Sequence, residues 1–195
     1  MSRRYLPHVL VGLLFAGAGL VAPTEAAAQG FITPFIGFDY GGDSGCQTVS
    51  DCEDKQSNIG VAFGKMGSAF GVEEELSYAR NFFGEAPGLS SNVLTLMSNI
   101  MIIPKIGPVH PYVLGGVGLI KTHTELTATS LLETSNNSFG WDFAGGVVVL
   151  FGGHVGVRGD IRRFSSFQER TILGFSLSNE KLSFKRASVG LVLAF

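Results

Sequence analysis

The chain has 195 residues and a formal net charge of -2, with 45% apolar, 11% aromatic and only 15% charged residues. This composition excludes a nucleic-acid binder driven by net basicity, because no surplus of lysine and arginine is present to neutralise phosphates. Disorder is excluded too, since the apolar content is ample for a buried core. The two cysteines are too few for a disulfide scaffold or a four-cysteine zinc site. We expect one domain without a cofactor.

Residues 1–28 have the pattern of a secretory signal peptide. Two arginines near the start form a positive region, residues 6–22 are mostly apolar, and small residues ending at Ala28 precede Gln29. An uncleaved signal anchor stays open, because the apolar run approaches the length of a membrane-spanning helix. We predict cleavage between Ala28 and Gln29, which leaves residues 29–195 as the mature domain.

After the signal, eight segments alternate apolar and polar residues with period two, which predicts β-strands. They lie at 30–40, 57–66, 69–83, 92–104, 110–122, 138–151, 153–164 and 183–195. Short connections separate three pairs of these segments, at 67–68, 105–109 and 152–153. We expect the four longer stretches to be loops, at 41–56, 84–91, 123–137 and 165–182.

The two faces of the predicted strands differ in kind. One face carries large aromatic and aliphatic side chains, such as Phe139, Trp141 and Phe143, and the other carries small residues with a few charges. The pattern also places Phe82 on the large-residue face, and Glu74 as well unless a bulge turns it. Large apolar residues suit a lipid-facing surface and small ones a narrow barrel interior.

Strands that cross a membrane must close into a barrel, because every backbone group in hydrocarbon needs a partner. The pattern therefore predicts an all-β fold, a closed eight-stranded antiparallel transmembrane β-barrel with up-and-down topology. A secreted sandwich or lipocalin-like barrel is the alternative.

Several short motifs carry a resemblance to a known family. The last strand alternates apolar residues up to a terminal phenylalanine, and further motifs lie at 34–37, 111–113 and 158–162. Over residues 30–195 the chain resembles the small eight-stranded outer-membrane β-barrels of Gram-negative bacteria, of the OmpA/OmpX-like kind, without a periplasmic OmpA-type domain. The resemblance implies export through the periplasm to the cell outer membrane, where lipid and lipopolysaccharide would surround it; we expect a monomer. It also implies that the outer-membrane assembly machinery reads the outward residues of the last strand, Val189, Leu191, Leu193 and Phe195.

The charged residues on the small-residue face form the main candidate site. They are Asp39, Glu73, Glu75, Asp142, Arg158, Asp160, Arg162 and Arg186. Charges held away from bulk water need partners, and these have both signs. We interpret them as a salt-bridge network that fills the lumen; an ion pathway or gate is the other interpretation.

Two cysteines, Cys46 and Cys52, lie in the first long stretch. Export through an oxidising compartment favours a disulfide between them. Several acidic residues surround the pair, but their spacing matches no calcium-loop motif. We therefore expect these acidic residues to be solvated.

Together these features predict a non-enzymatic integral outer-membrane barrel that acts in envelope integrity or surface interaction. One alternative is a narrow channel or small-solute transporter gated by the inward charges. The other is a lipid A-modifying enzyme. For that enzyme His123 is the candidate base, since it lies near the expected outer rim.

Overall fold

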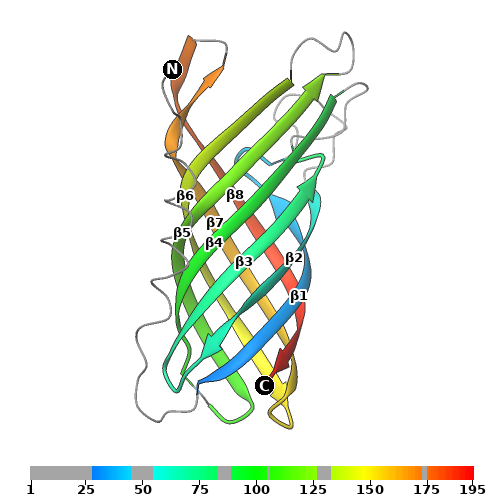
Figure 1. Cartoon of the computed structure of the whole chain (residues 1–195), viewed down its shortest axis with the longest axis vertical. Helices are drawn as coiled ribbons and strands as arrows, with labels where there is room; N and C mark the ends of the chain where they lie inside the picture. The colour runs from blue at the N-terminus through cyan, green and yellow to red at the C-terminus, as the bar shows by residue number, and fades with distance from the viewer. Residues whose placement is uncertain (1–27, 45–54, 83–88, 105, 127–132, 173–174) are drawn as a thin grey trace, which may run out of the picture.

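The computed structural model describes residues 28–44, 55–82, 89–104, 106–126, 133–172 and 175–195, which form an eight-stranded antiparallel β-barrel (Figure 1). The strands are β1 (Gln29–Tyr40), β2 (Lys55–Met66), β3 (Phe70–Arg80), β4 (Leu89–Ile102), β5 (Val109–Leu126), β6 (Glu133–Phe151), β7 (Val155–Ile172) and β8 (Phe175–Ala194). Each strand pairs with the next, and β8 pairs with β1 to close the sheet. The predicted fold is confirmed. Within the described residues, no helix is long and apolar enough to cross a membrane.

The register of the sheet is strongly staggered. Directly paired residues can be followed once around the barrel, from Lys65 on β2 up to Lys55 on the same strand. The path runs through Val72, Ile100, Gly115, Phe143, Arg163, Lys185 and Tyr40. Such a stagger tilts the strands steeply against the barrel axis, as Figure 1 shows.

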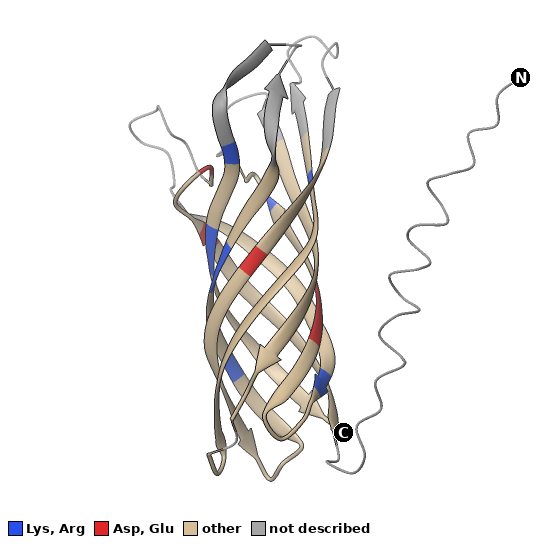
Figure 2. Cartoon of the chain, turned by 90° about the vertical axis from the view of Figure 1, so that its left-hand side faces the viewer, with Lys and Arg blue, Asp and Glu red and all other residues tan. Residues whose placement is uncertain are grey.

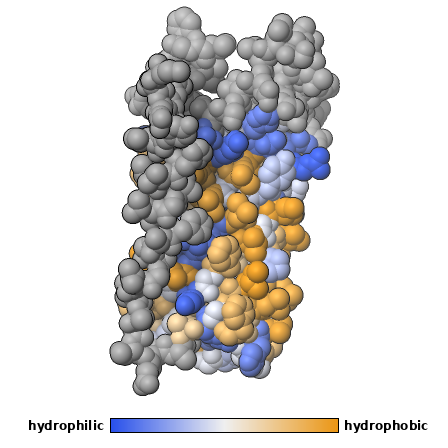
Figure 3. All heavy atoms as spheres, viewed as in Figure 1, coloured by the Kyte–Doolittle hydropathy of each residue, from blue (hydrophilic) through white to orange (hydrophobic). Residues whose placement is uncertain are grey.

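The alternation of inward and outward positions follows the prediction along the described strands, but the inward face is not confined to small and charged residues, because Phe164 and Phe184, for example, are buried in the lumen. In β1 the residues alternate strictly between buried and exposed from Phe31 to Asp39. The outward positions carry mostly large apolar residues; Phe143 and Ile161, for example, are 56% and 61% exposed. On the side seen in Figure 3, apolar side chains form a belt below a hydrophilic band near the upper end. Figure 2 shows that most of the strand ribbon carries no charge.

The prediction for Phe82 was wrong. A straight continuation of β3 would carry it outward, but β3 ends at Arg80 and Asn81 adopts φ 52°. This left-handed conformation, which asparagine tolerates better than most residues, interrupts the alternation of β3. Phe82 is thereby fully buried, with its ring edge-on to Phe184 at a centroid distance of 4.8 Å.

The expected loops at 123–137 and 165–182 were too long. Strands β5 and β6 continue through Leu126 and from Glu133, and β7 and β8 continue to Ile172 and from Phe175. The β7–β8 ladder passes through two register irregularities and rises above the other strands (Figure 1). The sequence of these extensions lacks a sustained alternation of apolar and polar residues, so the pattern that predicts a strand is missing although the backbone pairing continues.

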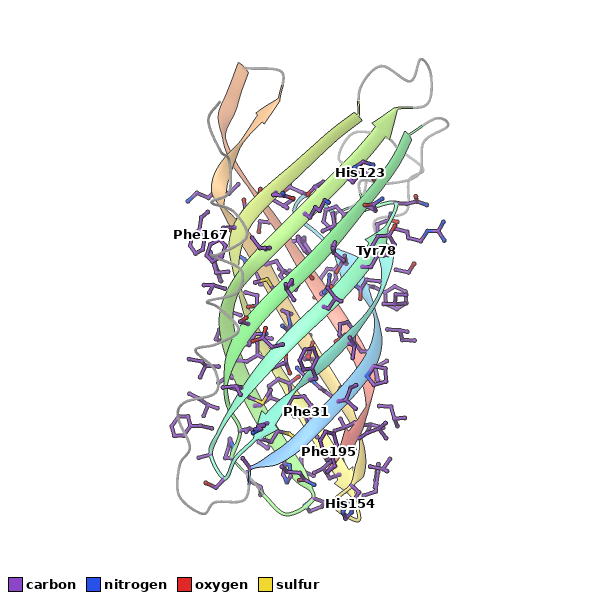
Figure 4. The ribbon with its side chains drawn as sticks, viewed as in Figure 1. Phe31, Tyr78, His123, His154, Phe167 and Phe195 are labelled. Carbon is purple, nitrogen blue, oxygen red and sulfur yellow. The ribbon has the colours of Figure 1, made fainter. Side chains whose placement is uncertain are left out.

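The lower end of the barrel is formed by tight turns. Gly152, Gly153 and His154 join β6 to β7, and the two glycines have φ values of 62° and 82°, which glycine adopts without a steric penalty. His154 marks this turn in Figure 4. The cleavage position at Ala28 and Gln29 lies at the start of the described chain, whereas the rest of the signal segment, Cys46 and Cys52 lie outside the described residues.

Candidate functional site

The barrel brings all eight predicted inward charges together in one layer of the lumen. They come from five strands and are buried, with exposures between 0% and 8%. They are Asp39 on β1, Glu73 and Glu75 on β3, Asp142 on β6, Arg158, Asp160 and Arg162 on β7, and Arg186 on β8. The period of two placed each one inward, and the closure of the sheet placed them opposite one another.

Arg162 lies at the centre of this layer. Its Nη2 lies 3.0 Å from Glu73 Oε1 and 2.8 Å from Glu75 Oε2. Its Nη1 donates to Asp142 Oδ2 at 2.7 Å. One guanidinium therefore joins carboxylates from β3 and β6 to β7.

The other two arginines extend the network in opposite directions. Arg186 donates from Nε to Asp39 Oδ1 at 2.7 Å and from Nη1 to Glu75 Oε1 at 3.1 Å. Arg158 pairs with Glu73 and lies 3.0 Å from Asp160. Because Glu73 and Glu75 each bridge two arginines, the charges form one continuous network across the lumen.

Acidic groups are in excess in this layer. Among the described residues, five buried carboxyl groups face three buried guanidinium groups. Each arginine thus has at least two acidic neighbours, so no guanidinium is left without a partner when one ion pair breaks.

Neutral side chains complete the network, and sequence reasoning did not assign them to it. Tyr112 accepts from Arg158 and donates to Asp160 Oδ2 at 2.6 Å. Asn99, oriented so that both amide atoms are satisfied, donates to Asp142 and accepts from Arg162. Both residues lie on the inward positions of their strands. The alternation pattern would have found them had it been applied to neutral polar residues.

Two apolar clusters enclose the charged layer. The lower cluster comprises Phe31, Met66, Met101, Ile103, Tyr112, Leu114, Ala144, Val148, Leu150, Val192 and Ala194. The upper cluster comprises Ala79, Phe82, Val93, Met97, Ile120, Phe164, Leu182 and Phe184. The guanidinium of Arg186 lies 4.7 Å from the ring centroid of Phe164, so aromatic faces form the upper boundary of the charged layer.

The outward face carries one carboxylate in its apolar belt. Glu74 pairs directly with Phe63 on β2 and with Ser98 on β4, without a bulge. It lies midway between Phe70 and Tyr78, which point outward near the two ends of β3.

The four predicted assembly residues all point outward at the foot of β8, where Val189, Leu191, Leu193 and Phe195 are exposed. Phe195 also closes the barrel seam through its backbone. Its N–H donates to Gly30 O at 2.9 Å, and Gly30 N–H donates to Phe195 O at 2.8 Å. A Cβ at Gly30 would lie 2.7 Å from the Phe195 ring, so a larger residue at this position would have to displace that ring.

The described histidines lie at the two ends of the barrel. His110 and His154 lie at the lower end and contact the backbone oxygens of Gly107 and Gly152, each at 3.0 Å. His123 lies near the upper end of β5 (Figure 4). In the part of the chain that the structure describes, no group of three or more His, Cys, Asp or Glu is placed to hold a metal ion.

Comparison with known proteins gives a family and a fold. Residues 12–195 match the family model described as "Outer membrane protein beta-barrel domain", whereas no curated protein sequence matches significantly. Neisserial surface protein A is similar in structure, with a TM-score of 0.63 and 12% identity over 85% of this chain and 97% of that chain. Ail of Yersinia pestis has a TM-score of 0.57 and 10% identity over 86% of this chain and 99% of Ail. OprG of Pseudomonas aeruginosa has a TM-score of 0.54 and 15% identity over 88% of this chain and 97% of OprG.

Proposed function

The chain belongs to the outer membrane protein beta-barrel family, and on that premise we propose that it is a non-enzymatic barrel with a closed lumen, supporting envelope integrity or surface contacts. It resides in the outer membrane, as the description of its family states. In this family the short turns are expected to face the periplasm and the longer connections the exterior.

The observation that carries the proposal is the filled lumen. The charged layer lies between two apolar clusters, and its eight charged side chains are at most 8% exposed. Ion conduction needs a path of water beside charged groups, whereas these groups contact one another and the aromatic side chains above and below them.

The energetics of the ion pairs support the same proposal over a gated channel. Moving Arg162 aside would separate it from Glu73, Glu75 and Asp142 together. Breaking a single buried pair from one side costs about 3–5 kcal/mol. A gate that opened by this movement would therefore be closed nearly all of the time.

The placement of the histidines supports a non-enzymatic role. A lipid-modifying enzyme needs a nucleophile within hydrogen-bond reach of its base. Of the three described histidines, His110 and His154 contact backbone oxygens at the lower end, opposite the leaflet in which lipid A resides. His123, near the upper end of β5, is therefore the one described histidine at the height of that leaflet. A mass spectrum of lipid A from cells with and without the protein tests this point; a mass change that depends on the protein would refute it.

The closed lumen is tested by conductance in planar bilayers. We expect wild-type protein and Arg162→Ala to remain at the background level, with the variant shifted to a lower unfolding temperature. Arg80→Ala, which removes an exposed arginine from the outward face of β3, is the matched control. A folded Arg162→Ala barrel with clearly increased conductance would favour the channel instead. Heat-modifiable migration on gels establishes that each variant is folded.

A further inference from the structure

Two cations lie directly opposite one another on the outer surface of the barrel. Arg163 on β7 pairs with Lys185 on β8, and both side chains are exposed. Directly opposed residues of an antiparallel pair have Cβ atoms about 5 Å apart, and like charges in that arrangement repel. Within the described residues, neither cation has an acidic partner.

The surroundings of this pair are polar above and aromatic on both sides. The next outward residues up the two strands are Ser165 and Ser183, which also face each other. In the row of the cations, Phe143 on β6 lies beside Arg163, and Tyr40 on β1 lies beside Lys185. Two cations and two hydroxyl groups thus form one block on adjacent strands, which we call the cation patch (Arg163, Ser165, Ser183 and Lys185).

The backbone beneath the patch is held in place. Ser183 N–H donates to Asp43 Oδ2, and Asp43 N–H donates to Ser183 O, both at 2.8 Å. The Asp43 carboxylate therefore holds the main chain of β8 at this point, and Ser183 presents its hydroxyl on the outward side.

The height of the patch matches the outer boundary of the apolar belt. Below Arg163 the outward residues of β7 are apolar down to Val155, and below Lys185 those of β8 are apolar down to Leu193. Eight residues of a tilted strand rise about 20 Å, against an apolar band about 25 Å tall in such barrels. Above the patch, Phe167 stacks on Phe139 at 5.9 Å and points away from the barrel (Figure 4).

We propose that the cation patch binds a phosphate group of outer-leaflet lipopolysaccharide. A phosphate offers several acceptor oxygens to the guanidinium, the ammonium and the two hydroxyl groups, and its charge converts the Arg163–Lys185 repulsion into shared attraction. The exposed side chains of Ile161 and Val189, just below the patch, suit the acyl chains that hang from a lipid phosphate. This apolar surface favours a phosphate on a lipid over a free phosphate ion.

Two other outward cations near this end are paired only with neutral residues. Arg80 on β3 pairs with Asn92, and Lys121 on β5 pairs with Leu94 and Asn137. They provide a matched control, because Arg80→Gln/Lys121→Gln removes the same charge as Arg163→Gln/Lys185→Gln from the same end of the barrel.

The proposal rests on the outer-membrane placement of the proposed function but not on the closed lumen. Trp141, the single tryptophan of the chain, pairs directly with Ser165, so its fluorescence reports on the patch. Bisphosphorylated lipid A is titrated into protein held in zwitterionic detergent. We expect saturable binding, weakened about tenfold for each charge-assisted hydrogen bond that a substitution removes, and hence about a hundredfold in Arg163→Gln/Lys185→Gln. The control double variant should bind within twofold of wild type.

Three further ligands test whether the patch prefers the phosphate of lipopolysaccharide to the phosphate of another lipid or to a free phosphate ion. Dephosphorylated lipid A, phosphatidylglycerol in the same detergent and inorganic phosphate should each bind at least tenfold more weakly than bisphosphorylated lipid A. Equal binding of any of these three would overturn the assignment to a lipopolysaccharide phosphate. An equal weakening in the two double variants would overturn the role of the patch. Arg163→Lys/Lys185→Arg, which retains both charges, should keep most of the affinity. Conductance in planar bilayers is unaffected by these variants if the lumen is closed. The closed lumen and the phosphate site can therefore be refuted independently of each other.

Discussion

The hydroxyl of Ser98 donates a 2.6 Å hydrogen bond to Glu74 Oε2 on the outward face of the barrel. The two residues are directly paired on β4 and β3, in the middle of a surface otherwise made of large apolar side chains. A carboxyl group facing lipid has few possible partners, and this hydroxyl is one.

Replacing Glu74 by leucine should stabilise the barrel. The carboxyl group faces hydrocarbon at mid-height, where an acidic side chain costs about 1 kcal/mol or more, and leucine continues the belt formed by Val72 and Leu76. Ser98→Ala alone should lower the free energy of unfolding by about 1.5 kcal/mol, the typical contribution of a hydrogen bond to a charged group. Urea titration in lipid vesicles measures both, and Ser98→Ala should have almost no effect in the Glu74→Leu background. A full effect there would show that the hydrogen bond is not its cause.

The excess of carboxyl groups in the lumen predicts unequal effects of neutralising the two signs. Arg186→Gln leaves Asp39 and Glu75 short of a cation and should cost about 3–5 kcal/mol. Glu75→Gln leaves Arg186 with Asp39 and Arg162 with Glu73 and Asp142, so it should cost much less. Thermal unfolding in detergent micelles compares the two variants. Equal destabilisation would mean that the charge excess has no role in stability.

The buried ring of Phe82 should contribute strongly to the stability of the upper apolar cluster. Phe82→Ala removes a fully buried aromatic side chain that packs against Phe184 and should cost about 3–5 kcal/mol. Phe167→Ala, which removes an exposed ring of the same size, is the control and should cost less than about 1 kcal/mol. If the two variants have the same melting temperature, Phe82 is not packed as described.

The end of β8 separates recognition by the assembly machinery from intrinsic stability. Phe195→Asp keeps both backbone hydrogen bonds to Gly30 but removes the terminal aromatic ring. The variant should refold into micelles from urea nearly as well as wild type, yet its level in the outer membrane of cells should fall at least tenfold. Wild-type membrane levels would exclude Phe195 as an assembly signal.

The disulfide between Cys46 and Cys52 stays a prediction, because both residues lie outside the described part of the chain. Alkylation of the exported protein without reductant should label neither thiol, and labelling should appear after reduction. The bridge closes a small loop and should contribute about 2 kcal/mol. Stoichiometric labelling of both thiols without reductant would contradict it.

Strict alternation made the barrel and its inward charges predictable from sequence. Arg158, Asp160 and Arg162 could be placed on one face because the side-chain period of a strand is two. The partners of these residues were not predictable to the same degree. Sequence left Glu73 and Glu75 equally open for Arg158, and the stagger of the closed sheet selects Glu73.

Two further differences have local causes. Phe82 follows a single left-handed residue, Asn81, and a pattern of hydrophobicity contains no sign of that backbone conformation. The backbone of β7 and β8 extends above the other strands (Figure 1), in a stretch whose sequence lacks sustained apolar alternation. Apolar alternation predicts a strand that is buried on one side against lipid or core, so it did not predict these extensions.

Several ion pairs of the lumen join strands that are not neighbours in the sheet. Glu73 and Arg158 connect β3 to β7 and are 85 residues apart in sequence, and Glu75 and Arg186 connect β3 to β8 and are 111 apart. Such contacts can form only once β7 and β8 have joined the sheet, and we expect this to follow the rate-limiting step of folding. Interactions absent from the transition state slow unfolding without speeding folding. The network is thus expected to set how long a finished barrel lasts in the membrane, while the rate at which new barrels appear depends on other parts of the chain.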